Sequence, residues 1–314
     1  MESFSTFSPE HADLFGRERA ARLAQGAHLT PQAESDRLAC EADAQSIKDA
    51  GIFIKPGFFD PQRLSALGAR IDGMIANREN LGRLRNHRLE FEQGRKLGDF
   101  LYLDPATVTS EDDIARHCAN VNIRDPLVTL PEIIDLVLDP RVLGTASAYF
   151  GCVPVLSYVK VLKAFANDLP AVDAQCFHRD TGSFWIFKSF IYLNDVAADG
   201  GPFTYMRGSQ RNRFSDQYSA DAYKRYEDDE VVREYGAENL MECTADLGAV
   251  VFAETTGMHK GKKPTAAPRW IIISTFCVHR EIGFQYSPLK IRAADLSPLS
   301  DVQRMVCDKI AVIE

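Results

Sequence analysis

The sequence predicts a mainly β protein with flanking helices, built as a sandwich or jelly roll. From about residue 153 onward, short β-forming runs alternate with turns rich in Gly, Asn and Asp, a pattern typical of such folds. A second observation points the same way. His178 and Asp180 are two positions apart, whereas His259 lies 81 residues beyond His178 (259 − 178). Only a fold that brings distant strands together can place these three side chains in one site.

The first third of the chain predicts helices around one short strand. Residues 1–50 are polar and favour a helical arm or cap, with candidate helices at 17–23 and 31–50. Residues 51–60 predict a short strand and turn. Residues 61–77 then place apolar side chains at helical spacing, namely Leu64, Leu67, Ile71 and Ile75. The stretch 78–123 is charged and irregular, without a clear pattern of either kind.

The core is expected over about residues 153–280. Its predicted strands are 155–165, 175–178, 184–193, 203–206, 249–254 and 270–278. β-branched and aromatic residues dominate these runs, as the pleated surface of a sheet favours. Residues 210–239, rich in Asp, Glu, Arg and Tyr, predict an exposed and mostly helical insertion between two strands.

Composition narrows the class of protein. A chain of 314 residues with 45% hydrophobic content suits one large globular domain or two small ones. The net charge of −8 and the pI near 5.5 argue against a nucleic-acid partner. No run reaches the ~20 apolar residues of a membrane helix, and the N-terminus lacks the features of a secretory signal. We therefore expect a cytoplasmic protein with no membrane partner, either a monomer or a homodimer.

Seven cysteines are scattered along the chain without a Cys-x-x-Cys pair. An odd, scattered count in a long chain indicates free thiols in a reducing compartment. Zinc-finger and disulfide-scaffold interpretations both fail on the spacing.

The most informative residues are His178, Asp180 and His259. Two histidines and one carboxylate are the ligands of a non-haem Fe(II) site, in which they hold one face of the metal and leave the other positions open. Alternate side chains of an extended strand share a face, so His178 and Asp180 can reach one ion while Arg179 points away. Arg269 begins a strand-forming run ten residues after His259 (269 − 259). Its guanidinium suits the far carboxylate of a dicarboxylic cosubstrate.

With these residues in place, the sequence resembles the phytanoyl-CoA dioxygenase-like branch of the Fe(II)/2-oxoglutarate oxygenases. The resemblance covers most of the chain. Its segments are the opening strand and turn at 51–60, a helix within 130–143, the strand, acidic turn and Gly-Pro strand at 184–208, and the strand at 246–252. It implies a double-stranded β-helix (jelly roll, cupin-like) core inside a domain over 51–314. It also implies Fe(II), 2-oxoglutarate and O2 as cofactors.

The resemblance further implies a dioxygenase that hydroxylates an unactivated C–H bond of a small metabolite, such as a natural-product intermediate or a sugar. 2-Oxoglutarate would be decarboxylated to succinate. Because the chain keeps Asp180, where halogenases of this chemistry have a small residue, hydroxylation is favoured over halogenation. Desaturation, epimerisation or ring formation at the same iron is the alternative. Outside the class, the alternative is a cupin-like metal-dependent isomerase or a binding module.

The sequence does not decide which residue would be a second anchor for the cosubstrate. The family often has a small hydroxyl residue two positions after the distal histidine, where this chain has Gly261. The hydroxyl-bearing candidates are Thr255, Thr256, Ser274 and Tyr192.

Lysines within apolar strands are the other candidates. A lysine that faces into a barrel needs a partner, which an oxoacid would provide, so Lys160 and Lys163 are candidate cofactor-binding residues. Lys188 has a similar setting. The alternative for each of them is a position on the solvated side of the sheet.

Overall fold

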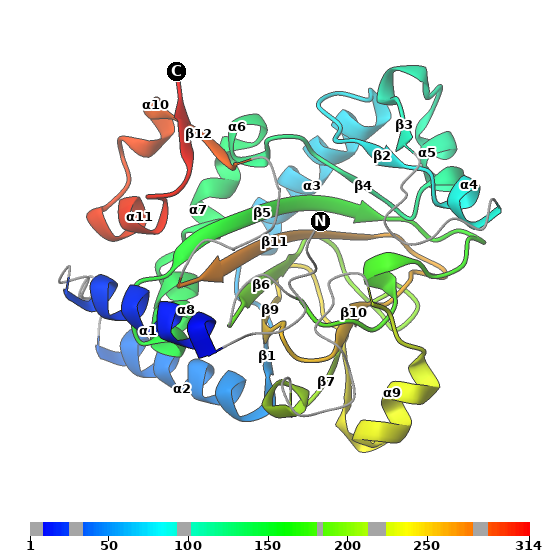
Figure 1. The fold of residues 1–314 in the computed structure, drawn as a ribbon. Helices are drawn as coiled ribbons and strands as arrows, with labels where there is room; N and C mark the ends of the chain where they lie inside the picture. The colour runs from blue at the N-terminus through cyan, green and yellow to red at the C-terminus, as the bar shows by residue number, and fades with distance from the viewer. Residues whose placement is uncertain (1–8, 25–33, 93–101, 181–184, 213–223, 279–287) are drawn as a thin grey trace.

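The computed structural model describes residues 9–24, 34–92, 102–180, 185–212, 224–278 and 288–314. Two antiparallel sheets form its centre (Figure 1). In spatial order, the larger sheet consists of β1 (Ile52–Lys55), β9 (Val250–Glu254), β6 (Phe187–Tyr192), β11 (Arg269–Cys277), β5 (Val155–Ala164) and β4 (Asn120–Asn122). The smaller sheet consists of β10 (His259–Gly261), β7 (Phe203–Met206) and β8 (Leu240–Cys243). The predicted mainly β core is confirmed.

The register of β11 assigns side chains to the two faces of the larger sheet. Arg269, Ile271 and Ile273 share one face, since Ile271 lies opposite Leu162 of β5 and Tyr192 of β6. Ile271 belongs to a core that also contains side chains of the smaller sheet, and Ile273 packs against this core. We call this the inner face. Residues of the opposite parity, such as Ile272 and Phe276, pack on the outer face in the core shared with the helices.

Helices cover the outer face. The residues at their ends are ones that favour the start or the end of a helix. α3 (Pro61–Ala76) begins where Asp60 accepts a hydrogen bond from the Gln62 amide at 2.9 Å, with Pro61 in the first turn. α8 (Pro140–Phe150) ends at Gly151, whose φ of 70° is the left-handed conformation that glycine adopts without strain. The apolar stripe predicted for α3 is buried as expected.

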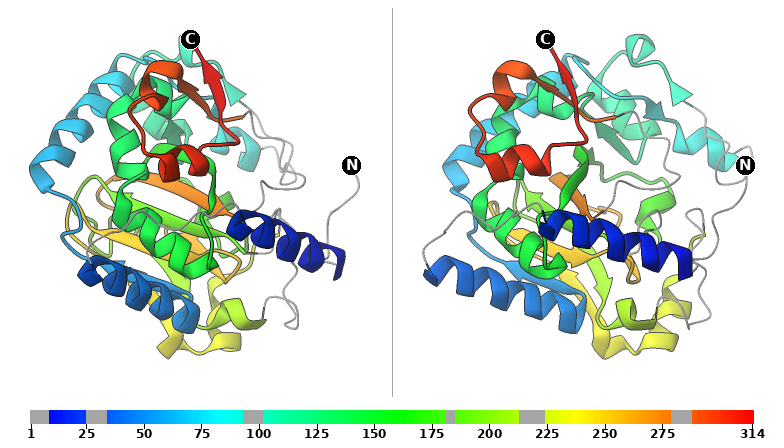
Figure 2. Two further views of the ribbon diagram at one scale, coloured as in Figure 1. Left: turned by 90° about the vertical axis from the view of Figure 1, so that its left-hand side faces the viewer. Right: turned by 60° about the vertical axis from the view of Figure 1, so that its left-hand side comes forward.

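The N-terminal segment forms α1 (Pro9–Ala24) and α2 (Glu34–Ala50), close to the predicted helices. α2 packs against α8 and β1, and Figure 2 shows it alongside the core. Arg22 of α1 donates to the Val153 carbonyl at 3.2 Å and pairs with Asp308 at 2.9 Å. The domain boundary near residue 50 stays a prediction.

Shorter elements complete the fold. They are β2 (Leu84–Arg85), α4 (His87–Glu92), β3 (Tyr102–Leu103), α5 (Glu111–His117), α6 (Pro126–Thr129), α7 (Ile134–Val137), α9 (Asp228–Tyr235), β12 (Lys290–Arg292), α10 (Ala293–Leu296), α11 (Asp301–Val306) and β13 (Ala311–Ile313). β12 contacts α6, which places the C-terminal elements beside α6 and α7 (Figure 1). Among the described helices, none combines the length and apolarity that a membrane crossing requires.

One predicted strand is wrong. Residues 175–178 do not form a regular strand, because Asp173–Gln175 is a 3-10 helix, η3. Phe177 and His178 then make single-residue bridges to two different partners, Tyr226 and His259. The helix expected within the insertion is α9, although residues 213–223 lie outside the described part. Residue 184, the expected start of another strand, also lies outside it.

Candidate metal centre

His178 and His259 are joined through their backbones. The His178 amide donates to the His259 carbonyl at 2.9 Å, and the His259 amide donates back at 3.0 Å. This bridge connects the segment after η3 with the first residue of β10. It brings the two imidazole rings to a centroid distance of 4.3 Å. The 81-residue separation in sequence is therefore closed by the main chain itself.

Each imidazole is held by its Nδ1 atom. His178 Nδ1 lies 3.0 Å from the Cys176 carbonyl, and His259 Nδ1 lies 2.9 Å from the Gly257 carbonyl. A carbonyl only accepts, so we assign the proton to Nδ1 and leave a lone pair on Nε2. Burial lowers the pKa of both histidines, which favours the neutral, metal-binding form.

Asp180 completes the group. Its Oδ1 lies 3.8 Å from His178 Nε2, and its Oδ2 lies 3.7 Å from His259 Nε2. The three ligand atoms all lie within 4.8 Å of one another. Burial by itself would raise the pKa of Asp180, but the Lys188 ammonium and the two histidines outweigh it and hold that pKa well below its usual range. The Lys188 Nζ atom lies 2.5 Å from Asp180 Oδ2.

Arg179 points away from the triad, as strand parity predicts. Its guanidinium donates to the carbonyls of Ser209 at 3.1 Å and Thr256 at 2.7 Å, and to the Tyr235 hydroxyl at 2.8 Å. These acceptors come from η4 (Ser209–Asn212), the β9–β10 connection and α9. Arg179 is only 2% exposed. Arg179 therefore connects η4, the β9–β10 connection and α9 through hydrogen bonds next to the candidate metal site.

Arg269 is buried at the start of β11 without an acid partner among the described residues. It is 6% exposed, and its Nη1 atom lies 3.5 Å from the Lys262 carbonyl. Its Nε atom has no hydrogen-bond partner. Burial lowers the pKa of the guanidinium. A Cβ at Gly261 would lie 2.9 Å from Arg269 Nη2, so the glycine leaves the room that the guanidinium occupies. The arrangement leaves a guanidinium available for a carboxylate.

Two of the proposed hydroxyl anchors already have partners. The Tyr192 hydroxyl donates to the Cys243 carbonyl at 2.8 Å and accepts from the Phe203 amide at 3.1 Å, which braces the two sheets. The Thr256 hydroxyl donates to Glu254 Oε1 at 2.7 Å. Each hydroxyl has one proton, so neither has a further hydrogen to donate to a carboxylate.

The structure separates two other candidates from the triad. Lys163 lies opposite Trp270 on the outer face and pairs with Asp72 at 3.1 Å and with Glu111. Ser274 is on the outer face as well, by its parity with Trp270. For Lys163 this is the outward-facing alternative that the sequence left open, and the placement argues against both residues as cofactor-binding residues. Both are buried on the helix side of the sheet.

Lys160, Lys188 and Thr275 share the inner face with Arg269, because Lys160 lies opposite Ile273 and Lys188 opposite Thr275. Sequence reasoning did not single out Thr275, whose hydroxyl is buried and unpartnered. It also did not assign Lys188 to the carboxylate ligand. Thr255, buried beside Asp180, also has an unpartnered hydroxyl, and its carbonyl accepts from the Asp180 amide at 2.8 Å.

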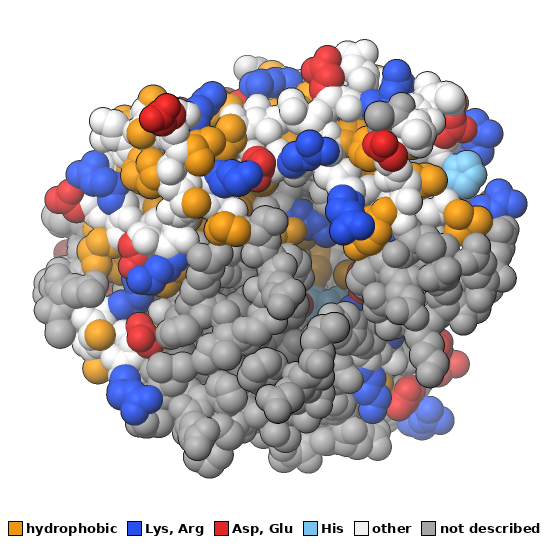
Figure 3. All heavy atoms as spheres, turned by 45° about the horizontal axis from the view of Figure 1, so that its top comes forward, with side chains coloured by type: hydrophobic (Ala, Val, Ile, Leu, Met, Phe, Trp, Pro, Cys, Tyr) orange, Lys and Arg blue, Asp and Glu red, His pale blue; other side chains and the backbone are white. Residues whose placement is uncertain are grey.

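Figure 3 shows one face of the molecule with a central hollow. Lys and Arg side chains gather along its edge, and a histidine is visible inside. On the part of the edge that is not grey, Lys and Arg side chains lie beside hydrophobic ones.

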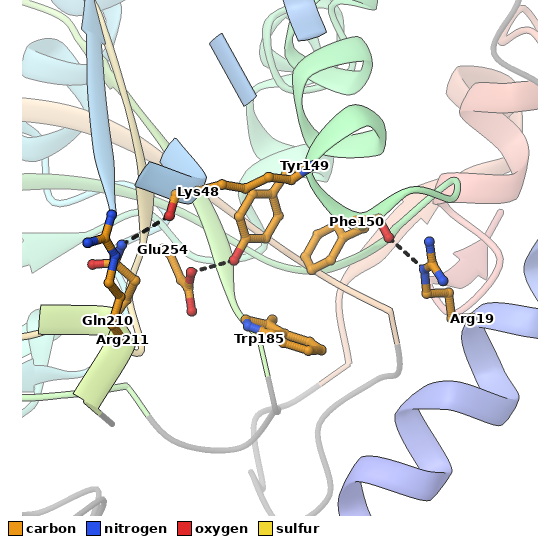
Figure 4. A pocket seen from close by; sticks show the side chains of 8 residues that line it. All are labelled: Arg19, Lys48, Tyr149, Phe150, Trp185, Gln210, Arg211 and Glu254. Carbon is orange, nitrogen blue, oxygen red and sulfur yellow. Dashed lines mark hydrogen bonds between the residues drawn. The ribbon is translucent and has the colours of Figure 1, made fainter. Parts of the chain in front are cut away.

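A cavity of about 410 Å³ has none of the three candidate metal ligands in its lining (Figure 4). It is lined by Arg19, Lys48, Tyr149, Phe150, Trp185, Gln210, Arg211 and Glu254. The Glu254 carboxylate accepts from the Tyr149 hydroxyl at 2.6 Å as well as from Thr256. Glu254 is thus held by hydrogen bonds on the outer side of β9, and this cavity supplies none of the three candidate ligands.

Comparisons with known proteins identify the architecture. No family model and no curated protein matches the chain. Among solved structures, the alpha-ketoglutarate-dependent epimerase SnoN from nogalamycin biosynthesis is similar at 16% identity and a TM-score of 0.52, over 76% of this chain and 83% of that one. EctD from S. alaskensis, solved with 2-oxoglutarate and 5-hydroxyectoine, is similar at 13% identity and a TM-score of 0.50, over 80% and 79% of the two chains. The fold is the double-stranded β-helix of 2-oxoglutarate-dependent oxygenases.

Within this double-stranded β-helix, the triad and Arg269 have distinct supports. His259 belongs to the smaller sheet and Arg269 to the larger one. The Arg269 side chain reaches the smaller sheet at Gly261, in the same strand as His259. The candidate metal site and the candidate carboxylate site are therefore built on opposing sheets.

Proposed function

We propose that this protein is an Fe(II)/2-oxoglutarate-dependent dioxygenase of the phytanoyl-CoA dioxygenase-like branch. It oxidises an unactivated C–H bond of a small metabolite, with hydroxylation as the outcome. One observation carries the proposal: two neutral histidines and a carboxylate converge beside a buried guanidinium that no described acid neutralises.

The residues present fit the cofactors. Two imidazole Nε2 atoms and one carboxylate form the donor set of a non-haem Fe(II) site with open positions. The unpartnered Arg269 Nε atom suits the distal carboxylate of 2-oxoglutarate. His178, Asp180 and His259 would hold the metal, and Arg269 would hold the cosubstrate. When bound, iron, 2-oxoglutarate and O2 together supply an oxidant strong enough to remove hydrogen from a C–H bond.

The chain itself supplies position and electrostatics. The Cys176 and Gly257 carbonyls fix the orientation of the imidazoles, as outer partners of metal ligands generally do. Lys188 holds Asp180 in place and balances part of its charge. The apolar side chains of Phe190 and Ile271 on the inner face limit access of water. No residue of the triad needs to transfer a proton in this role.

Epimerisation at the same site is the second candidate. It is supported by the structural similarity to SnoN, an epimerase, and desaturation and ring formation remain alternatives of the same kind. All of these reactions share the metal site and the cosubstrate, so they differ only in the fate of the substrate radical. The product, rather than the protein, distinguishes them.

The first test measures succinate formation by the protein supplied with Fe(II), 2-oxoglutarate and O2. We expect slow turnover that requires all three, and its loss in Asp180→Ala because a ligand is removed. His117→Ala, at the C-terminal end of α5, is the matched control and should retain turnover. Metal-dependent turnover of a compound without consumption of 2-oxoglutarate would instead support an isomerase. Binding without turnover would support a binding module.

A second test separates the outcomes within the class. Once a substrate is found, product mass under labelled O2 should increase by one labelled oxygen if the reaction is hydroxylation. An unchanged mass with inverted stereochemistry would support epimerisation, and loss of two hydrogens would support desaturation or ring formation. A chlorinated product in the presence of chloride would contradict the role given to Asp180.

A further inference from the structure

Two buried hydroxyl groups in the neighbourhood of Asp180 have no hydrogen-bond partner. They belong to Thr275 of β11, which is 2% exposed, and to Thr255, which directly follows β9 and is fully buried. No described residue donates to either hydroxyl or accepts from it. A buried hydroxyl without a partner lowers the stability of a fold, and native proteins contain few such groups. These two hydroxyls therefore require an explanation other than packing.

The strand register places Thr275 next to the candidate metal centre. Thr275 lies directly opposite Lys188 of β6 on the inner face, and side chains opposite each other have Cβ atoms about 4.5–5.5 Å apart. The Lys188 Nζ atom lies 2.5 Å from Asp180 Oδ2. Thr255 reaches Asp180 through the main chain, because its carbonyl accepts from the Asp180 amide at 2.8 Å. Both hydroxyls therefore belong to residues around Asp180, and Thr275 is the one beside the Lys188 side chain.

The donors of this group suit an oxygen atom of a ligand. The Lys188 ammonium has three protons to donate, and Asp180 is its one ion-pair partner within the described parts of the chain. A ligand atom that contacts both Lys188 and Thr275 has to accept hydrogen bonds, because an ammonium only donates. The Lys188 and Asp180 side chains are 19% and 20% exposed, so a ligand can approach them from solvent. Figure 3 shows a hollow in which a histidine is visible from the surface.

2-Oxoglutarate does not account for this position. Thr275 lies six residues beyond Arg269 on the same strand and the same face (275 − 269), or roughly 20 Å at the rise of an extended strand. A five-carbon cosubstrate with its distal carboxylate at Arg269 ends well short of Thr275. The oxygen atom therefore has to come from another molecule, and the substrate is the remaining one.

We infer that Thr275 and Lys188 bind the oxygen atom of a carbonyl or carboxylate group in the substrate. This inference rests on the proposed function and adds a substrate class to it. The bound oxygen would hold the substrate beside Asp180 and so present the neighbouring carbon atoms to the metal. A purely hydrocarbon group at this position would leave the Thr275 hydroxyl unpaired, which disfavours it. Thr275 is in this role a specificity-determining residue and not a metal ligand.

The test removes single hydroxyl groups. Thr275→Val removes the hydroxyl and keeps the shape of the side chain. The matched control is Ser274→Ala, one position away on the outer face, which also removes a buried hydroxyl without a partner. Four probes are titrated into each protein, metal-free and with Zn(II) and 2-oxoglutarate, and binding is followed by ligand-observed NMR. The probes are acetophenone, benzamide, benzoate and α-methylstyrene, which has a methylene group in place of the acetophenone oxygen.

We expect the wild type to bind at least one of the three carbonyl probes. Thr275→Val should bind it about three- to tenfold more weakly, because a hydrogen bond is lost, whereas Ser274→Ala should bind every probe as the wild type does. α-Methylstyrene should not distinguish the three proteins. Equal affinity of Thr275→Val and the wild type for the carbonyl probes, including no binding to either, would overturn the inference. The probe that binds best, ketone, amide or carboxylate, identifies the group.

Thermal denaturation of the ligand-free variants separates binding from folding. Removing a hydroxyl that has no partner should leave the melting temperature unchanged or raise it, in Thr275→Val as in Ser274→Ala. A melting temperature that falls in Thr275→Val alone would assign this hydroxyl to the stability of the fold and contradict the inference.

Affinity for 2-oxoglutarate, measured by calorimetry, distinguishes a failure of this inference from a failure of the proposed function. Thr275→Val should bind 2-oxoglutarate as the wild type does, whereas weaker binding would assign Thr275 to the cosubstrate and overturn the inference. If the wild type with Fe(II) binds no 2-oxoglutarate and forms no succinate, the proposed function fails. The probe titrations of the metal-free protein still decide the oxygen site in that case.

Discussion

At the scale of single residues, the structure distinguishes charges that are satisfied within the protein from charges that are not. Arg179 and Lys163 are buried with partners, in hydrogen bonds and ion pairs respectively. Arg269 and Lys160 face the interior of the barrel without an acid of their own among the described residues. Cations of the first kind support structure, whereas those of the second kind are candidates for ligand binding.

Replacing Arg269 tests the cosubstrate site. Arg269→Leu should weaken 2-oxoglutarate binding by about 2–5 kcal/mol, because a charge-assisted contact disappears and a carboxylate is left unpaired. Fe(II) affinity should change little, since Arg269 is not a ligand. Arg269→Lys should restore only part of the loss, because a lysine lacks the planar fork. Calorimetry with each ligand measures both, with the exposed Arg116→Leu as control. An unchanged 2-oxoglutarate affinity in Arg269→Leu would rule out this role.

His87 should make stability depend on pH. Burial, with help from Arg85, lowers its pKa to about 4, and its Nδ1 atom has no partner. The unfolded chain binds this proton near pH 6.5. The stabilising contribution is therefore complete above pH 6.5 and is lost as the pH falls toward 4.

Urea unfolding at pH 7 and pH 5 would measure this contribution. On acidification His87→Gln should lose less stability than the wild type, by roughly 2 kcal/mol. The comparison is made between pH values within each protein, so any constant cost of the substitution cancels. His178 and His259 act in the same direction in both proteins. An identical loss in both would contradict the assignment.

Sequence spacing was sufficient to predict the cluster of His178, Asp180 and His259 that the structure brings together, and insufficient for its surroundings. His178, Asp180 and His259 follow from ligand chemistry and strand parity. Parity also implies that Lys160 and Lys163, three positions apart on one strand, cannot both face inward. Which of the two does so depends on how the sheets pack, and the carbonyl that occupies the Tyr192 hydroxyl comes from Cys243, in a strand far away in sequence. These features could not be read from local pattern.

At the scale of elements, β10 and β11 meet where Gly261 approaches Arg269. Gly261→Ala would place a Cβ 2.9 Å from Arg269 Nη2. That atom ends a flexible side chain, so the guanidinium should move while the pairing of β10 with β7 persists. We expect weaker 2-oxoglutarate binding with nearly unchanged Fe(II) affinity and thermal stability, all measured on the purified variant.

Gly73→Ala in α3 is the control, because nothing lies within 4 Å of its added Cβ. Alanine in a helix should be neutral or stabilising by about 0.5–1 kcal/mol. It should leave 2-oxoglutarate binding unchanged. If Gly261→Ala also leaves 2-oxoglutarate binding unchanged, the contact between Gly261 and Arg269 does not contribute to that binding.

The strands were predicted best where β-forming residues are continuous. The runs at 155–165, 203–206, 249–254 and 270–278 agree closely with β5, β7, β9 and β11. The error at 175–178 arose because two backbone bridges to different partners produced no strand. β10 was not predicted, since His259-Lys260-Gly261 has little β-forming character and exists through its pairing with β7.

At the scale of the molecule, the two N-terminal helices differ in how they are attached. Removing residues 1–33 deletes α1 and the Arg22 contacts and should lower the melting temperature moderately. Removing residues 1–50 also deletes α2, whose Cys40, Ala44 and Ile47 are buried. Loss of Ile47 burial alone costs roughly 1.5–3 kcal/mol. We expect the longer deletion to aggregate or unfold, as thermal denaturation would report. Equal melting temperatures for both deletions would make α2 dispensable.

The backbone bridge between His178 and His259 bears on how the site is assembled. Bringing together the ends of an 81-residue excursion (259 − 178) costs loop-closure entropy, which grows only slowly with length. Here two main-chain hydrogen bonds and the surrounding sheets close that loop. Folding of the chain alone therefore offsets the loop-closure entropy, without a bound ion. In small zinc domains the binding of the ion has to offset the entropy of loop closure, and chelators therefore unfold these domains. This protein should keep its secondary structure and cooperative unfolding in a chelator, and its metal should exchange without refolding of the chain.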